Sequence, residues 1–167
     1  ENSEISGDSY TYLQLDKGKY LLALADGMGS GELAREESAA SIEMYEDFAS
    51  AGFNRETILE AINSVLLLDE GRECFSTLDI CTVDLYSGEA EFIKIGAVST
   101  FIAKGRNVEV LSSSSLPVGI LGKVDREIFN KTLAKGDIIV MLTDGVIDSR
   151  GGSIRSEDWI KSAIKER

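Results

Sequence analysis

The sequence predicts an α+β domain built in layers. Two strand-like segments near the N-terminus lead directly into two consecutive helical segments. After residue 68 the chain becomes a series of short strand-like segments joined by predicted hairpin turns, and one amphipathic helix follows them. Helices grouped apart from antiparallel strands are typical of helices packed on the faces of antiparallel sheets.

The individual elements follow from hydrophobic periodicity. Strands are expected at residues 9–15, 20–25, 77–85, 89–95, 100–103, 108–111, 127–133 and 138–142, and helices at residues 32–50, 55–68 and 156–165. Asn54 is expected to cap the second helix. The first helix has an apolar face of Leu33, Ala34, Ala40, Ile42, Met44, Tyr45 and Phe48, and the second has one of Ile58, Leu59, Ile62, Val65 and Leu66. We expect both faces to pack against a sheet and against each other.

Composition excludes several classes of function. A formal net charge of −12 argues against nonspecific binding to nucleic acid or to an anionic membrane surface. The absence of histidine excludes Ser-His-Asp and Cys-His catalysis and HExxH zinc sites. Two cysteines suggest a reducing compartment, and Cys81 is expected to pack as a small hydrophobic residue. The 167 residues are expected to form a single domain that is truncated at both ends. The first residue, Glu1, is not an initiator methionine, which agrees with a fragment.

One stretch, residues 19–34, organises the rest of the chain. A buried strand ends at Asp26, a glycine-rich turn follows, and a long helix begins. An aspartate at such a junction can simply cap a turn or a helix. However, Asp144 also follows an apolar strand and precedes a glycine, and Asp8 lies just before the strand at residues 9–15. Carboxylates that recur at strand ends could converge on one magnesium or manganese site.

Hairpin geometry supports a shared site for two of these acids. Asp8 precedes the first strand and Asp26 follows the second, and residues 16–19 read as the turn between them. An antiparallel hairpin brings those two sequence ends together. We therefore expect the Asp8 and Asp26 side chains to be neighbours.

The glycine-rich turn also matches the fingerprint of dinucleotide-binding folds, through Gly29, Gly31 and Ala34. Asp26 and Glu32 flank this turn, whereas a pyrophosphate at a helix N-terminus requires positive potential. The next element is a second helix rather than a second parallel strand. A metal-dependent hydrolase acting on phosphate esters fits better, because two ions bridged by carboxylates activate a bound water without histidine.

Several motifs then resemble a known family. The sequence is similar to the PPM (type 2C) serine/threonine phosphatases, and within them to the phosphatase domain of stage II sporulation protein E, through Ser6-Gly-Asp-Ser-Tyr10, Ala25-Asp-Gly-Met-Gly-Ser-Gly31, Ser76-Thr-Leu-Asp79, Leu116-Pro-Val-Gly-Ile120, Lys135-Gly-Asp and Thr143-Asp-Gly145. The resemblance extends over about residues 5 to 149. It implies a four-layer α-β-β-α sandwich with two antiparallel sheets.

The resemblance also implies a metal site and a substrate. Asp26 would bridge two manganese or magnesium ions, the carbonyl of Gly27 and the carboxylate of Asp144 would each bind one ion, and Asp8 would contribute directly or through water. Asp26 and Asp8 are thus the implied catalytic residues. The implied substrate is a phosphoserine on a small anti-anti-sigma factor whose dephosphorylation frees a sporulation sigma factor. The parent protein would be anchored to the membrane, with this domain in the cytoplasm.

Two departures from the family pattern bear on activity. Many relatives have histidine where this chain has Met28, so water or another acid would protonate the leaving oxygen. The family's C-terminal Asp-Asp or Asp-Asn motif is not found before Arg167, which predicts weak metal binding and weak activity for this fragment. A catalytically silent relative that binds proteins through the same fold is the alternative function.

The two long helices form a predicted regulatory element. Since the first helix begins directly after Asp26 and Gly27, a movement of that helix would displace them. The resemblance implies that substrate or self-association, including homodimerisation through these helices, drives such a switch; the alternative is a rigid packed pair. Thr77 and Asp79 are expected to be strand residues near the site, and their direct participation in the chemistry is the alternative.

Overall fold

The structure is a computed structural model that describes residues 5–29, 31–68, 74–148 and 156–166. Its described strands form two antiparallel sheets, one of five strands in the order β1-β2-β3-β4-β7 and one of three strands in the order β6-β5-β8. The strands are β1 (Asp8–Asp16), β2 (Lys19–Asp26), β3 (Leu78–Asp84), β4 (Glu89–Ile95), β5 (Thr100–Lys104), β6 (Asn107–Leu111), β7 (Glu127–Thr132) and β8 (Ile138–Val140). The chain passes to the second sheet at β5, returns for β7 and crosses again to β8.

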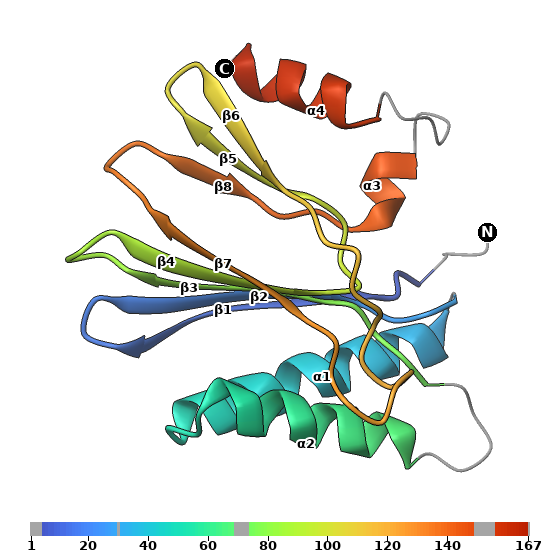
Figure 1. The fold of residues 1–167 in the computed structure, drawn as a ribbon. Helices are drawn as coiled ribbons and strands as arrows, with labels where there is room; N and C mark the ends of the chain where they lie inside the picture. Colours follow the sequence, from blue (N-terminus) through green and yellow to red (C-terminus); the bar gives the residue numbers. More distant parts are fainter. Residues whose placement is uncertain (1–4, 30, 69–73, 149–155, 167) are drawn as a thin grey trace.

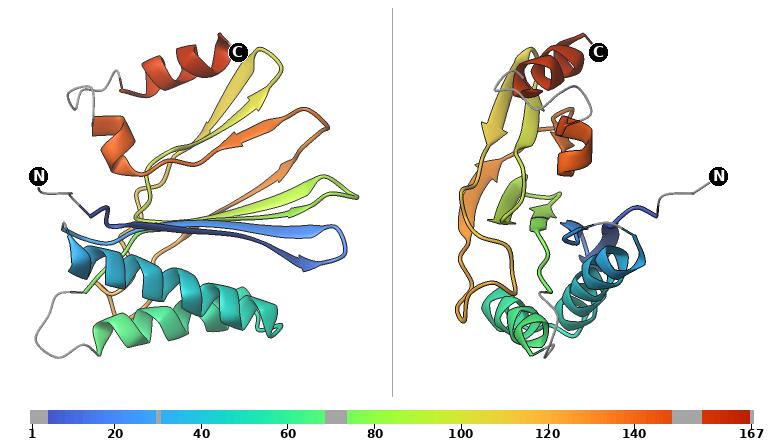
Figure 2. Two further views of the ribbon diagram at one scale, coloured as in Figure 1. Left: turned by 180° about the vertical axis from the view of Figure 1, so that it is seen from behind. Right: turned by 90° about the vertical axis from the view of Figure 1, so that its right-hand side faces the viewer.

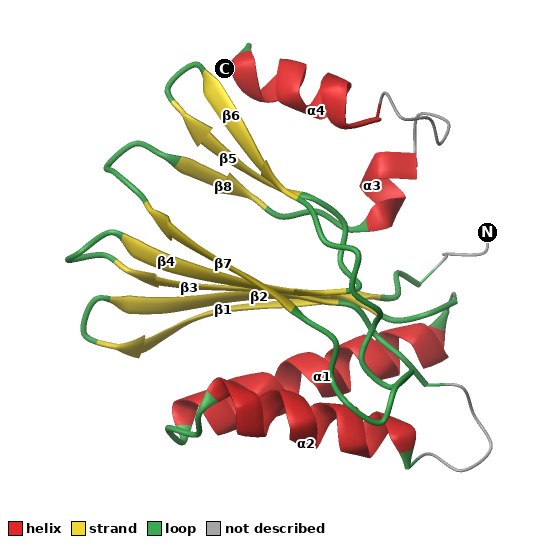
Figure 3. Ribbon diagram, in the orientation of Figure 1, coloured by secondary structure: helices red, strands yellow, loops and turns green. Residues whose placement is uncertain are grey.

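The helices enclose the two sheets from outside. Figure 1 shows α1 (Glu32–Ser50) and α2 (Arg55–Leu67) side by side under the five-stranded sheet, with the three-stranded sheet on its other side. The helix α4 (Ser156–Lys165) lies over the outer side of β5 and β6, and the short α3 (Asp144–Asp148) lies beside it (Figures 1 and 2). Figure 3 shows the same order, with helices outermost and strands within. The predicted four-layer α-β-β-α architecture is confirmed.

Successive side chains of the central strands point to opposite faces of the sheet and therefore contribute to two separate cores. Leu21, Leu78, Ile80 and Ile93 pack toward α1 and α2 in the first core. Side chains at the alternate positions of these strands, including Cys81, Val83 and Phe92, point to the opposite face. They form the second core, between the two sheets, together with Ile102 of β5. Cys81 is fully buried, as predicted, and burial raises the pKa of its thiol to about 12. Each fully buried leucine, isoleucine or phenylalanine side chain in these cores stabilises the fold by about 1.5–3 kcal/mol.

Most predicted elements lie within a few residues of the observed ones. The predicted cap is present, since the Asn54 side chain accepts a hydrogen bond from the backbone N–H of Thr57 at 2.9 Å. The apolar faces of the helices are narrower than predicted: Leu33, Ala40 and Val65 are exposed. Counting apolar residues along a helix overestimates its buried face, because neighbouring elements cover only part of the stripe.

The region after β8 differs from the sequence prediction. The strand ends at Val140 instead of residue 142, and a short helix begins at Asp144. The backbone N–H of Val146 donates to the carbonyl of Thr143 at 3.2 Å, which closes the first turn of α3. Asp144 therefore lies at the start of a helical turn near the end of the sheet. No helix among the described residues is both long enough and apolar enough to cross a membrane.

Candidate active site

The β1–β2 hairpin brings Asp8 and Asp26 face to face. They are direct partners in the antiparallel register, at the open end of the hairpin. At the closed end, the turn places Gly18 at a φ of 77°, a conformation that glycine adopts without steric cost. The predicted juxtaposition of these two acids is confirmed.

The backbone on either side of Asp26 is held from three directions. Asp26 N–H donates to Thr77 Oγ1 at 3.1 Å, and the Asp26 carbonyl accepts from Thr77 N–H at 2.9 Å and from Ser76 Oγ at 3.1 Å. The N–H of Gly27 donates to the Gly7 carbonyl at 3.1 Å. Thr77 was predicted only to lie near the site. The structure shows that it fixes the backbone of Asp26.

The close approach of α1 requires a glycine at position 27. A Cβ at this position would lie 1.8 Å from the carbonyl oxygen of Ala34, in the first turn of the helix. No side chain can be accommodated without moving α1 away from β2. The strand end that carries Asp26 and the start of α1 are therefore packed backbone against backbone.

Asp144, the first residue of α3, joins the pair from the segment that follows the second sheet. The Asp26 carboxyl hydrogen-bonds with the carboxyls of both Asp144 and Asp8. Thr143 Oγ1 donates to Asp8 Oδ2 at 3.3 Å, and Ser6 Oγ donates to the same oxygen at 3.0 Å. Residues distant in sequence, from β1, β2 and the loop after β8, thus converge at one end of the sandwich.

The three carboxyls repel one another when ionised. The pKa of Asp26 is raised from 3.8 to about 7, first by burial and then by the charge of and hydrogen bond to Asp144, with Asp8 adding a smaller effect. Within the described parts of the chain, no group of three or more Asp, Glu, Cys or His side chains has the spacing of a formed metal cluster. The donor set nevertheless fits a hard divalent cation, since three carboxyls meet at Asp26 and a cation would relieve their repulsion.

A buried ion pair lies directly behind these acids. Lys94 Nζ lies 2.7 Å from Asp79 Oδ2 and 2.9 Å from Thr100 Oγ1, and all three side chains are essentially inaccessible to solvent. Thr100 also hydrogen-bonds to Asp79 Oδ2. The sequence analysis missed Lys94 and Thr100. The available indication was that Lys94 takes an inward position, two residues after Phe92, in an otherwise apolar strand.

A small cavity connects the ion pair with the acids. It has a volume of about 50 Å³, and its lining includes Asp26, Thr77, Asp79, Thr143 and Asp144. Asp79 therefore lies between Lys94 on its inner side and the carboxyl cluster on its outer side.

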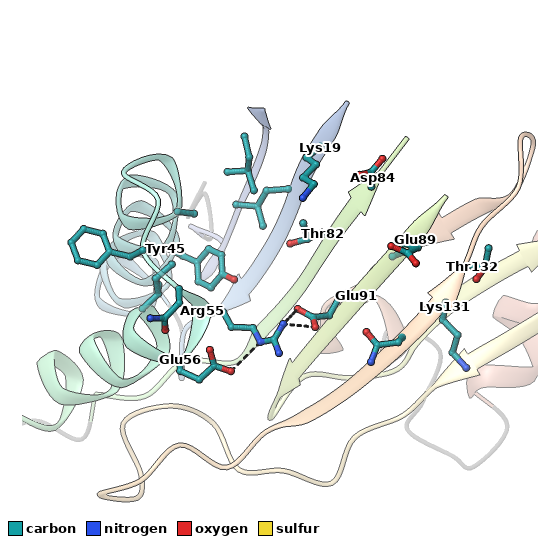
Figure 4. Close-up of a pocket in the computed structure, with 18 residues that line it drawn as sticks. Lys19, Tyr45, Arg55, Glu56, Thr82, Asp84, Glu89, Glu91, Lys131 and Thr132 are labelled. Carbon is teal, nitrogen blue, oxygen red and sulfur yellow. Dashed lines mark hydrogen bonds and ion pairs between the residues drawn. The ribbon is translucent and has the colours of Figure 1, made fainter. Parts of the chain in front are cut away.

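A larger cleft lies at the other end of the sheet. It has a volume of about 760 Å³, and its lining includes residues from the start of α2 and from the ends of β2, β3 and β4 that are farthest from Asp26. Figure 4 shows Arg55 reaching from α2 to Glu91 on β4, with Glu56 beside it. The positive and negative side chains of the cleft largely neutralise one another, and its lining does not include Asp8, Asp26 or Asp144.

Comparisons with known proteins agree with this architecture. A family profile described as "Stage II sporulation protein E (SpoIIE)" matches residues 16–166. The stage II sporulation protein E of Priestia megaterium is 36% identical over 162 residues, which are 97% of this chain and 28% of that protein. The phosphoserine phosphatase RsbX of Bacillus subtilis (strain 168) is 30% identical over 149 residues, which cover 87% of this chain and 70% of RsbX.

Solved structures show the same fold. The PP2C phosphatase domain of SpoIIE from Bacillus subtilis, solved with a fragment of its regulatory domain, superposes with a TM-score of 0.87 and 34% identity, and the match covers 98% of this chain and 47% of that one. A structure of RsbX in complex with magnesium superposes with a TM-score of 0.70 at 24% identity, covering 98% of this chain and 70% of that one. This chain has the fold of the PP2C phosphatases and belongs to the stage II sporulation protein E family.

Proposed function

We propose that this chain is the catalytic domain of a metal-dependent protein phosphatase that hydrolyses phosphoserine. The observation that carries the proposal is the convergence of Asp8, Asp26 and Asp144 at the end of the sandwich, where they share one carboxyl–carboxyl network. The names of relatives add support, since RsbX is a phosphoserine phosphatase and the similar solved domain is a PP2C phosphatase.

Two manganese or magnesium ions are the proposed cofactors. Asp26, Asp8, Asp144 and the carbonyl of Gly27 would hold them. Bound there, the ions would lower the pKa of a water molecule to produce the attacking nucleophile and would neutralise charge on the phosphoryl oxygens. The crystallised complex of RsbX with magnesium supports the choice of a divalent cation.

The protein's own groups prepare this site. Asp26 is about half protonated near pH 7, so it must lose a proton as a cation binds. Ser76 and Thr77 hold its backbone, and Thr143 and Ser6 orient Asp8 through its Oδ2. Met28 is 52% exposed beside the site and cannot donate a proton, so water or another acid would protonate the departing serine oxygen.

The proposed substrate is a phosphorylated anti-anti-sigma factor whose dephosphorylation activates a sporulation sigma factor. The family to which the chain belongs supports this choice. The parent protein is proposed to be membrane-anchored, with this domain in the cytoplasm and out of contact with lipid and nucleic acid. The charge of −12 is unfavourable for binding to either of these anionic partners.

Self-association through α1 and α2 is the proposed regulatory contact. A cavity of about 400 Å³ between these helices is lined partly by the exposed apolar side chains of Leu33, Val65 and Leu68. Because α1 packs on Gly27, a partner seated against the helices would act on the backbone next to Asp26.

The decisive experiment is manganese-dependent release of phosphate from a phosphoserine protein and from a small aryl phosphate. It compares this chain, its Asp26→Asn variant, an Asp47→Asn control on the exposed face of α1, and a version extended past Arg167. We expect turnover that requires metal, persists in the control and disappears with Asp26→Asn. A folded, extended protein that binds its partner and shows no turnover with or without metal would favour a silent binding domain.

A further inference from the structure

The buried ion pair of Asp79 and Lys94 lies behind the carboxyl cluster. Asp79 and Lys94 are direct partners on β3 and β4, and both point into the space between the two sheets. Thr100, on β5 of the other sheet, contacts both of them. Burying two charges costs more than their attraction usually returns, so apolar residues would stabilise this position equally well or better. The presence of charged groups therefore calls for an explanation other than stability.

The two oxygens of Asp79 have different surroundings. Oδ2 accepts from both Lys94 Nζ and Thr100 Oγ1. Oδ1 is buried and has no hydrogen-bond partner among the described residues. A buried carboxylate oxygen without a partner loses its hydration and gains nothing in return, so a polar group is expected next to it.

The small cavity provides the place for that group. Asp79 lines it together with Asp26, Thr77, Thr143 and Asp144, and its volume of about 50 Å³ suits a single water molecule. The strand register supports this geometry: Asp79 is the partner of Leu24, so Asp26 lies two residues further along β2 and on the same face as Asp79. Polar atoms of several residues around the cavity can satisfy one water.

We propose that Asp79 is a positioning residue of the metal centre, whose Oδ1 binds one water in this cavity and through it orients the carboxyl groups of Asp26 and Asp144. Lys94 and Thr100 fix the carboxylate of Asp79 so that this oxygen keeps facing the cavity. Ligands held by such an outer layer of hydrogen bonds bind their metal more tightly, commonly by 10- to 100-fold. The inference rests on the proposed function, because it presumes that Asp26 and Asp144 bind a cation.

Two double variants distinguish a positioning role of Asp79 from a contribution to packing alone. Asp79→Leu with Lys94→Met removes the ion pair and leaves no polar group at position 79. Asp79→Asn with Lys94→Met also removes the ion pair, but it keeps an amide that can bind the water. Neither variant strands a buried charge, and Glu91→Gln is the control, since it breaks an ion pair on the same strand on the side of the helices.

The affinity for Mn²⁺ is measured by calorimetry and by electron paramagnetic resonance of the free ion, after circular dichroism and thermal unfolding have identified the folded variants. We expect the leucine variant to bind Mn²⁺ at least about tenfold more weakly than wild type, and the asparagine variant and the control to remain within about threefold. A folded leucine variant with wild-type affinity overturns the inference. If that variant does not fold, a high-resolution crystal structure of the wild-type protein decides, and no water within hydrogen-bond distance of Asp79 Oδ1 overturns it.

The readout distinguishes this inference from the proposed activity. A protein that binds Mn²⁺ with the expected differences but releases no phosphate refutes the phosphatase and leaves the role of Asp79 intact. Turnover with equal affinities in all variants refutes the role of Asp79 alone. A wild-type protein that does not bind Mn²⁺ refutes both.

Discussion

Asp8 and Asp26 oppose each other across the open end of the β1–β2 hairpin, and Asp26 is also hydrogen-bonded to Asp144 at the start of α3. Burial, together with the contact to these two acids, raises the pKa of Asp26 to about 7. The cluster is thus an unfavourable arrangement of like charges that a cation would convert into a favourable one.

The first prediction concerns the pH dependence of stability without metal. Between about pH 4 and pH 7 the folded protein keeps a proton on Asp26 that the unfolded chain has released, so the free energy of unfolding should fall as pH rises. Asp26→Asn should remove this slope and stabilise the metal-free protein at pH 8 by about 1–2 kcal/mol, after allowance for solvent screening of a partly exposed group. Urea unfolding with a chelator at pH 5 and pH 8 measures both effects. Asp47→Asn should retain the slope of the wild-type protein.

The second prediction concerns the binding of metal. Because Asp26 must be deprotonated to act as a ligand, Mn²⁺ binding at pH 7 should release protons, and the affinity should increase between about pH 6 and pH 8. Calorimetry in buffers of different ionisation enthalpy counts the released protons. At a free concentration of about 100 times the dissociation constant, Mn²⁺ should stabilise the fold by about 2.7 kcal/mol. Asp26→Asn should abolish both the proton release and the stabilisation by Mn²⁺. If both persist in this variant, the cation binds at another site.

The third prediction concerns the contact between β2 and α1. Gly27→Ala would place a methyl group 1.8 Å from the Ala34 carbonyl in the present geometry, so the helix must shift. We expect a loss of stability of about 1–3 kcal/mol together with a loss of metal-dependent activity. Gly122→Ala is the matched control, because a Cβ there meets no atom within 4 Å and should change stability by less than about 0.5 kcal/mol. Equal behaviour of the two variants would contradict the tight packing of α1 on Gly27.

The fourth prediction concerns the regulatory helices. Ile62 is fully buried, so Ile62→Ala should destabilise the fold by about 2–5 kcal/mol and would confound any effect on activity. Val65 is 49% exposed, and Val65→Ala should change stability by no more than about 0.5 kcal/mol. Val65 is therefore the better probe: a changed specific activity or a changed monomer–dimer equilibrium in this variant, with unfolding unaltered, supports a switch. Unchanged values of both would favour a rigid pair of helices.

Local pattern was sufficient for the elements and for one contact in the site. The alternation in β1 and β2 and the turn between them predicted that Asp8 would meet Asp26, because hairpin pairing is a local property of the chain. The order of strands and helices predicted the α+β class, and the motifs shared with a known family predicted the four layers. The short helix α3 escaped prediction because its five residues are too few to show a helical period.

The sequence by itself determined that the chain has strands ending in aspartates, two amphipathic helices after the first hairpin, and no histidine for catalysis. Only the tertiary structure decided that Asp144 reaches Asp26, that Val65 is exposed while Ile62 is buried, and that Asp79, Lys94 and Thr100 form a buried unit. The reason is physical. Periodicity reports which face of an element is apolar, whereas the contacts between sheets depend on how residues separated by many positions are packed together.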